Sequence, residues 1–107
     1  MPRVNAPIFP HERRQLAGLG ERLRDARRRR RFTAEETAAR VGITAVTLRR
    51  LERGEPGVGV GTLARLLTVL SLGSDVDRIA IDDALGRRLD EARLPERARR
   101  PNSGRAK

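Results

Sequence analysis

The sequence contains no cysteine, tryptophan or tyrosine, and only two of its 107 residues are phenylalanine. Without cysteine the chain can form neither a disulfide nor a thiolate site, which is compatible with a reducing cytoplasm. A core without bulky aromatic residues must be built from Leu, Val, Ile and Ala, and this composition suits packed helices better than sheets. Because the length allows only one small domain with tails, the sequence predicts an all-α fold.

Long apolar runs and catalytic motifs are also missing. No stretch approaches the ~20 apolar residues of a membrane span, and no signal-peptide pattern opens the chain, so we expect a soluble cytoplasmic protein without a membrane partner. The HExxH, GxSxG and Walker phosphate-loop motifs are absent. His11 has no neighbouring ligand candidate, and helix caps explain the aspartates of residues 75–83 better than a metal cluster does. We therefore expect neither catalysis nor a bound metal or cofactor.

Positive charge is what the chain has in excess. It carries 24 lysines and arginines against 14 acidic residues, which gives a formal net charge of +10. Each cation placed near a phosphate displaces a condensed counterion, so a polyanion is the natural partner. An anionic membrane would need a lone amphipathic helix with exposed apolar residues, whereas the apolar faces of this chain are needed for a core. Nucleic acid is the expected partner.

The stretch from Thr33 to Gly54, TAEETAARVGITAVTLRRLERG, predicts two short helices joined by a tight turn. Thr33 and Glu36 have the spacing of a capping box, in which each side chain satisfies one backbone N–H at the helix start. Gly42 can end this helix in a left-handed conformation, and Thr44 offers an N-cap hydroxyl two residues later. So short a connection is typical of a helix-turn-helix.

The second of these helices, expected from about Ala45 to Arg53, is amphipathic. Leu48 and Leu51 share one face. The opposite face carries Val46, Arg49, Arg50 and Arg53. An arginine stripe on a helix is most often only solvated, but two caps at this spacing favour DNA recognition.

Other segments also have helical periodicity. A first helix is expected from Pro10 to about Arg30, and its apolar stripe consists of Leu16, Leu19, Leu23 and Ala26. A helix over about residues 60–72 has an apolar face formed by Val60, Leu63, Leu66, Leu67 and Leu70. Two short helices are expected to follow, one after Ser74 and one over residues 83–92, the latter capped by Asp82 and apolar at Leu85 and Leu89.

The ends of the chain differ in composition from its middle. Residues 1–9 hold two prolines without periodicity and predict an N-terminal arm, and residues 93–107 hold six basic residues against one acid and predict a disordered tail. The tail can serve as a second polyanion contact, as a segment that folds on a partner, or only as a solubilising extension. The helix-turn-helix domain is thus expected over residues 10–92, with the motif itself at 33–54.

Five consecutive arginines, Arg27 to Arg31, close the first helix. Like charges repel one another there, so a use beyond complementing the helix dipole is expected. We expect Arg27 to point inward, and Arg28, Arg30 and Arg31 to contact phosphates.

Several of these segments resemble Cro/phage-repressor (XRE) helix-turn-helix proteins. The resemblance covers about Leu16 to Gly73 and is carried by the LRDAR, FT, VGIT and LRRLERG segments. The chain departs from the family at Arg31, where glycine is usual, and at Thr37, where leucine is usual, and the second departure predicts a weaker core. The GVGVGTLARLLTVLSLG and LPERARR segments additionally resemble HipB-type antitoxins, which repress their own operon and bind a HipA-type kinase toxin.

The resemblance implies roles for individual residues. Arg27 is expected to pair with Glu52, an ion pair that the register of the first helix also favours. Positions matching the base-reading residues of the family are Ala45, Val46 and Arg50, and only Arg50 can form hydrogen bonds to a base edge. The residues expected to hold DNA phosphates are Thr44, Thr47, Arg49 and Arg53, with Arg28, Arg30 and Arg31.

These expectations together describe a dimeric repressor that binds a double-stranded operator, and the antitoxin resemblance adds a HipA-type toxin as partner. Two alternatives remain at this point. The chain can be a stand-alone XRE regulator, or a module that binds a protein or coats nucleic acid without reading its sequence.

Overall fold

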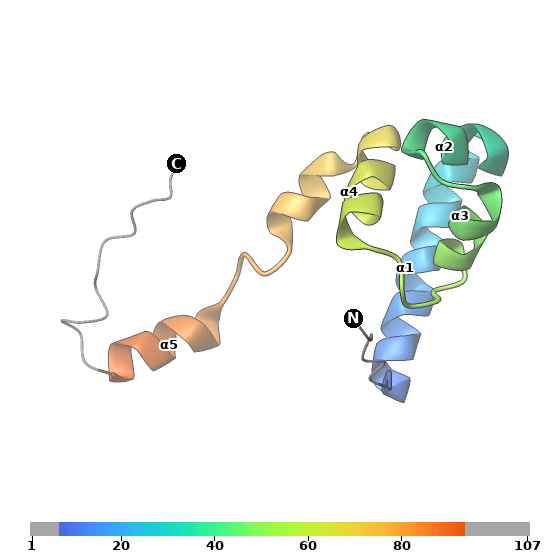
Figure 1. Cartoon of the computed structure of the whole chain (residues 1–107). Helices are drawn as coiled ribbons and strands as arrows, with labels where there is room; N and C mark the ends of the chain where they lie inside the picture. The colour runs from blue at the N-terminus through green and yellow to red at the C-terminus, as the bar shows by residue number, and fades with distance from the viewer. Residues whose placement is uncertain (1–6, 94–107) are drawn as a thin grey trace, which may run out of the picture. The chain divides into compact units, whose positions relative to one another are not determined.

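The computed structural model describes residues 7–93 and confirms the all-α fold, because these residues form helices and no strand. The elements are α1 (Pro10–Arg29), α2 (Ala34–Val41), α3 (Ala45–Glu52), α4 (Val60–Val69), the 3₁₀ helix η1 (Gly73–Arg78) and α5 (Ala84–Ala92) (Figure 1). Within this range no helix is both long and apolar enough to cross a membrane.

The chain divides into two compact units, Met1–Val76 and Asp77–Lys107. The first contains α1 to α4, and the second contains α5. Most of the predicted N-terminal arm and nearly all of the predicted basic tail lie outside the described residues, so these domain boundaries stay predictions.

Local hydrogen bonds explain where the first three helices begin. Pro10 occupies the first position of α1, and the Phe9 N–H before it donates to the Glu12 carboxylate at 3.1 Å. The capping box of α2 is formed as predicted: the Glu36 N–H donates to Thr33 Oγ1 at 3.0 Å, and the Thr33 N–H donates to the Glu36 carboxylate at 2.9 Å. The Thr44 hydroxyl caps α3 by accepting from the Thr47 N–H at 3.1 Å.

The first four helices all end in the same way. Each is followed by one residue with positive φ. The backbone N–H of the next residue donates to the carbonyl oxygen of the residue five positions earlier, and this pattern is a Schellman motif. The four residues with positive φ are Arg31 (59°), Gly42 (89°), Gly54 (82°) and Ser71 (62°). Two of the four helices therefore end without the glycine that this conformation favours.

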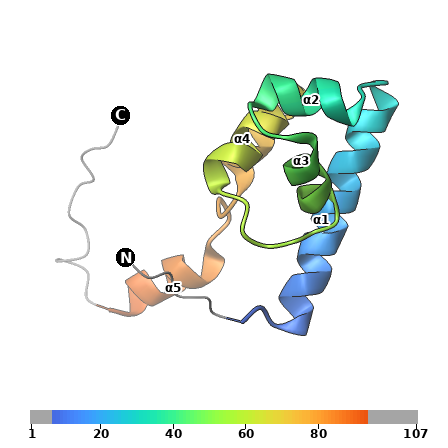
Figure 2. The ribbon, with the colours of Figure 1, turned by 45° about the vertical axis from the view of Figure 1, so that its right-hand side comes forward.

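The core of the first unit is aliphatic. Its ten buried apolar side chains are Leu23, Ala26, Ala34, Ala38, Val41, Leu48, Leu51, Leu66, Leu67 and Leu70. In Figures 1 and 2, α3 lies beside α1, and its main packing partners are α1 and α2, while α4 packs on α2. Arg65 adds a polar link, because its Nε donates to the Val41 carbonyl at the end of α2 at 3.1 Å.

Glycine allows α1 and α3 to approach each other closely. A Cβ at Gly20 would lie only 2.6 Å from the Leu51 carbonyl oxygen, and one at Gly54 would lie 2.6 Å from the Ala17 backbone. Both distances are shorter than real Cβ contacts, so the two helices touch through their backbones at these points. Gly20, which weakens the first half of α1 as an isolated helix, is required by this packing.

The structure corrects several predictions in the C-terminal half. Val60 is 80% exposed and does not join the apolar face of α4, because it is the first residue of the helix and its side chain points back beyond the first turn. The helix ends at Val69 instead of Leu72, because Ser71 adopts positive φ. The expected helix after Ser74 is the 3₁₀ helix η1.

The predicted cap of the last helix was wrong by one residue. Asp83, and not Asp82, caps α5, because its Oδ1 accepts from the Gly86 N–H at 2.9 Å. Asp82 instead pairs with Arg87, with 3.2 Å between Oδ1 and Nη2. Leu85 and Leu89 of α5 are both exposed.

Candidate nucleic-acid interface

Helix α3 has one anchored face and one outward face. Leu48 and Leu51 are buried in the core, together with the carboxylate-bearing Glu52. The outward face consists of Val46, Arg49, Arg50 and Arg53, all of them exposed. Because its inner face is fixed, α3 can present these side chains as a rigid surface.

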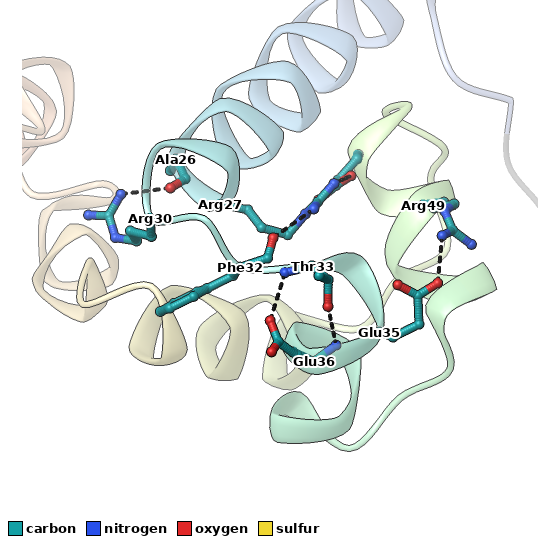
Figure 3. Close-up of polar contacts among 9 residues, drawn as sticks. Ala26, Arg27, Arg30, Phe32, Thr33, Glu35, Glu36 and Arg49 are labelled. Carbon is teal, nitrogen blue, oxygen red and sulfur yellow. Dashed lines mark hydrogen bonds and ion pairs between the residues drawn. The ribbon is translucent and has the colours of Figure 1, made fainter.

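A buried ion pair fixes α3 against α1. Arg27 Nε donates to Glu52 Oε2 at 2.7 Å, and Arg27 Nη2 donates to Glu52 Oε1 at 3.0 Å, so the contact is bidentate. Arg27 Nη1 also donates to the Phe32 carbonyl at 3.0 Å, in the turn before α2 (Figure 3). The hydrogen bonds that Arg27 donates to the Glu52 carboxylate hold the pKa of the Arg27 guanidinium above its ordinary value, against the opposing effect of burial. One side chain thus joins α1, α3 and the turn that leads to α2.

Two glutamates bind two of the outward arginines. Arg49 Nη2 lies 2.9 Å from Glu35 Oε2 (Figure 3). Arg53 contacts Glu55 Oε2 through Nη2 at 3.1 Å and through Nε at 3.2 Å. Arg50 Nε is 3.9 Å from the other Glu55 oxygen, which is beyond hydrogen-bond range. Such exposed pairs are weak, so phosphates can replace the glutamates.

The other base-reading candidates differ in exposure. Val46 is 57% exposed, whereas Ala45 is partly buried and packs against the core. At the same end of α3, the Thr44 hydroxyl donates to Thr47 Oγ1 at 3.0 Å, so the two candidate phosphate ligands are already joined to each other.

The structure brings some of the predicted phosphate-binding arginines together and separates others. Arg28, Arg49 and Arg53 line a common cavity between α1 and α3. Arg30 instead donates to the Ala26 carbonyl at 2.8 Å, and Figure 3 shows it on the opposite side of this region from Arg49. Arg31 occupies the left-handed turn after α1. The structure therefore places Arg30 and Arg31 outside this cavity.

Three residues near this surface were not predicted from the sequence. Arg24 lines the same cavity as Arg28, and its position one helical turn before Arg27 and Arg28 could have revealed it. Glu55 lies two residues from Arg53 and could also have been found. Glu35 is fourteen residues from Arg49, and no local pattern connects them.

Within residues 7–93, no group of three or more His, Cys, Asp or Glu side chains is placed to hold a metal ion.

A capped two-helix motif whose second helix presents an arginine-rich outward face defines a helix-turn-helix protein. The family model described as "Helix-turn-helix domain" matches residues 18–80, and the chain belongs to this family. It is therefore a DNA-binding regulator by class, and the match is consistent with the resemblance to Cro/phage-repressor proteins. Comparison with curated proteins and with solved structures finds no match.

Proposed function

We propose that the protein is a sequence-specific repressor that binds a double-stranded operator as a homodimer, with α3 in the major groove. The observation that supports this most directly is the arrangement of α3. Its inner face is fixed by Leu48, Leu51 and the bidentate Arg27–Glu52 pair, while Val46 and Arg50 point outward. A helix held in this way can place side chains reproducibly against base edges.

Arg50 is the proposed base-reading residue with hydrogen-bonding capacity. Its guanidinium fork suits the O6 and N7 acceptors of guanine, and its nearest carboxylate partner, Glu55, is beyond hydrogen-bond range. Val46 can contact a thymine methyl group, and Ala45 can contribute a smaller apolar contact. Thr44, Thr47, Arg49 and Arg53 are proposed to hold phosphates around this reading surface.

Replacing Arg50 and Arg53 separately with alanine tests this assignment. A preferred duplex is first selected from a random library, and wild-type affinity for it should exceed affinity for random duplex by about 10³ or more. Arg50→Ala should cost about 1 to 3 kcal/mol of binding free energy on the selected duplex and relax the preference at one base pair, while Arg53→Ala should weaken binding to all duplexes alike. Equal, sequence-independent losses for both variants would show that Arg50 only contacts phosphate.

The salt dependence of binding provides a second test. If about six phosphates are contacted by a dimer, the logarithm of the binding constant should fall with the logarithm of the salt concentration with a slope of about −5. A two-fold dimer further requires two protomers per operator and half-sites about one helical turn apart. A slope near zero would exclude nucleic acid as the partner.

A protein partner is the second proposal, and exposed apolar side chains favour it. Ile79, Ile81, Leu85 and Leu89 are each more than half exposed in the second unit, and exposed groups of apolar residues mark interaction sites. Together with the resemblance to HipB-type antitoxins, this leads us to propose a HipA-type kinase toxin as that partner. The purified protein should then bind the protein encoded by the adjacent reading frame. Leu85→Asp should abolish that binding and leave the affinity for DNA unchanged.

A further inference from the structure

The cavity between α1 and α3 has a lining that is almost entirely arginine. It has a volume of about 200 Å³, and its lining residues are Arg24, Arg27, Arg28, Arg49, Glu52 and Arg53. We call this cavity the α1–α3 arginine pocket. It contains five guanidinium groups and one carboxylate, so its lining has a large excess of positive charge.

The acids around the pocket compensate only part of this charge. Glu52 neutralises Arg27, and Glu35 and Glu55 bind Arg49 and Arg53 from outside the pocket. Among residues 7–93, no ion pair involves Arg24 or Arg28. Guanidinium groups gathered in this way repel one another, and an anion placed between them would convert that repulsion into attraction.

Arg24 provides an independent observation. Its Nε is buried, and it has no hydrogen-bond partner within the described part of the chain. Burying a donor without a partner is energetically unfavourable, so an acceptor that entered the pocket beside Arg24 would relieve this cost. Arginine Nε and Nη groups together form a planar fork that matches the oxygens of a phosphate group.

We propose that the α1–α3 arginine pocket binds one phosphate group of the DNA backbone, with Arg24 and Arg28 as its ligands from α1. This inference rests on the proposed function. Arg49 and Arg53 line the pocket and also belong to the outward face of α3. A phosphate held there would fix the position of α3 relative to the DNA backbone, and so the register in which Arg50 and Val46 meet the bases.

Charge-matched variants of α1 provide the first test. Arg24→Gln and Arg28→Gln should each weaken binding to selected and random duplexes by about tenfold, because a charged hydrogen bond to phosphate is lost. Each should also reduce the salt slope by about 0.9 per protomer. Arg22→Gln removes the same charge from α1 at an exposed residue outside the pocket lining, and it should change affinity less than twofold.

Replacement of single phosphates in the selected duplex by neutral methylphosphonate locates the contact. At one phosphate of each half-site the replacement should cost the wild type about tenfold in affinity, and it should cost Arg24→Gln clearly less, because one of the two α1 ligands of that phosphate is already gone. Equal losses in the wild type and the variant at every position would overturn the proposal. Arg24→Lys keeps the charge but not the fork, and it serves as the second variant if Arg24→Gln does not fold.

Inorganic phosphate distinguishes a backbone phosphate from a free ion. If millimolar inorganic phosphate raises the melting temperature of the wild type while Arg24→Gln binds DNA normally, the pocket takes a free anion and the DNA assignment is overturned. Failure of the proposed function has a different signature, since the wild type would then not discriminate between selected and random duplexes. Arg24→Gln would still weaken binding to both, because a phosphate contact is independent of sequence.

Discussion

Gly20 of α1 faces the backbone carbonyl of Glu52 in α3, with no space between them for a side chain. A Cβ at Gly20 would lie 2.7 Å from the Glu52 carbonyl carbon and still closer to its oxygen. The atoms in the way belong to backbone, so they cannot rotate aside as a flexible side chain would. The position of α3 on α1, and with it the position of the whole outward face, depends on this glycine.

Gly20→Ala should therefore destabilise the protein although alanine is the better helix former. The gain in helix propensity is about 1 kcal/mol, and the forced separation of α1 and α3 should cost more, for a net loss of about 1 to 3 kcal/mol. Gly18→Ala is the matched control, because a Cβ there meets only the Arg22 Nη1 atom at 3.3 Å, and it should be neutral or stabilising. Urea denaturation of both variants measures the difference, and equal effects would contradict the packing argument.

Removing one partner of the Arg27–Glu52 pair should be worse than removing both. Either Arg27→Met or Glu52→Leu leaves a buried charge without its partner, which costs about 3 to 5 kcal/mol. The double variant leaves no buried charge and should recover most of that loss. Thermal melts of the three variants form a double-mutant cycle, and additive losses would show that the two side chains do not stabilise each other.

The parts of the site that the sequence predicted are those with local signals. The capping box of Thr33 and Glu36 and the Thr44 cap each involve residues three apart. Together with the leucine periodicity of α3, they were enough to place the helix-turn-helix. The amphipathic pattern also predicted which residues of α3 face outward.

The parts that the sequence did not predict depend on tertiary contacts or on unusual backbone. From the sequence alone, Gly20 only lowers the helix propensity of α1, and its role becomes clear only from the close packing of α3 against it. The end of α4 was placed too late because Ser71, and not a glycine, adopts the left-handed conformation. Arg31 does the same after α1, so its departure from the family glycine leaves the turn intact and strains one residue.

Thr37 occupies a core position and should be improved by removing its hydroxyl. The residue is 1% exposed, and its Oγ1 has no hydrogen-bond partner among residues 7–93. Thr37→Val keeps the shape and removes the buried polar group, so we expect a gain of about 1 kcal/mol in the free energy of unfolding. Thr68→Val is the control, because the exposed Thr68 hydroxyl donates to the Ala64 carbonyl at 3.1 Å, and it should not stabilise. A loss of stability in Thr37→Val would show that the hydroxyl has a partner in solution.

The stability of the fold should decline at acidic pH, partly because the carboxyl groups of Glu35 and Glu36 in the first turn of α2 become protonated. The pKa of Glu36 is lowered mainly by a hydrogen bond from the Thr33 backbone N–H and, to a smaller extent, by the Thr33 hydroxyl. The pKa of Glu35 is lowered mainly by the backbone N–H of Glu35 itself and, to a smaller extent, by Arg49. A carboxyl group whose pKa is lower in the folded than in the unfolded protein stabilises the fold. This contribution is fully present when the pH is above the unfolded pKa, here 4.5, and it is lost as the pH falls through the lower pKa of the folded protein.

Glu36→Gln isolates this effect. The amide oxygen can accept the same hydrogen bond from the Thr33 N–H but does not titrate, so the variant should lose less stability than the wild type between about pH 5 and 3. Chemical denaturation across this range provides the measurement. Identical pH profiles for the two proteins would exclude a contribution from Glu36.

The packing of the first unit has a consequence for the order of events during synthesis. Its main helix pairs, α1 with α3, α2 with α3 and α2 with α4, join elements that are adjacent or next but one in the chain. Helical proteins with contacts this local fold within microseconds to milliseconds, whereas ribosomes add only about 5 to 20 residues per second. The compact unit ends at Val76, so the arginine-bearing face can assemble as soon as the first 76 residues are free of the ribosome, and it does not need the residues that follow them.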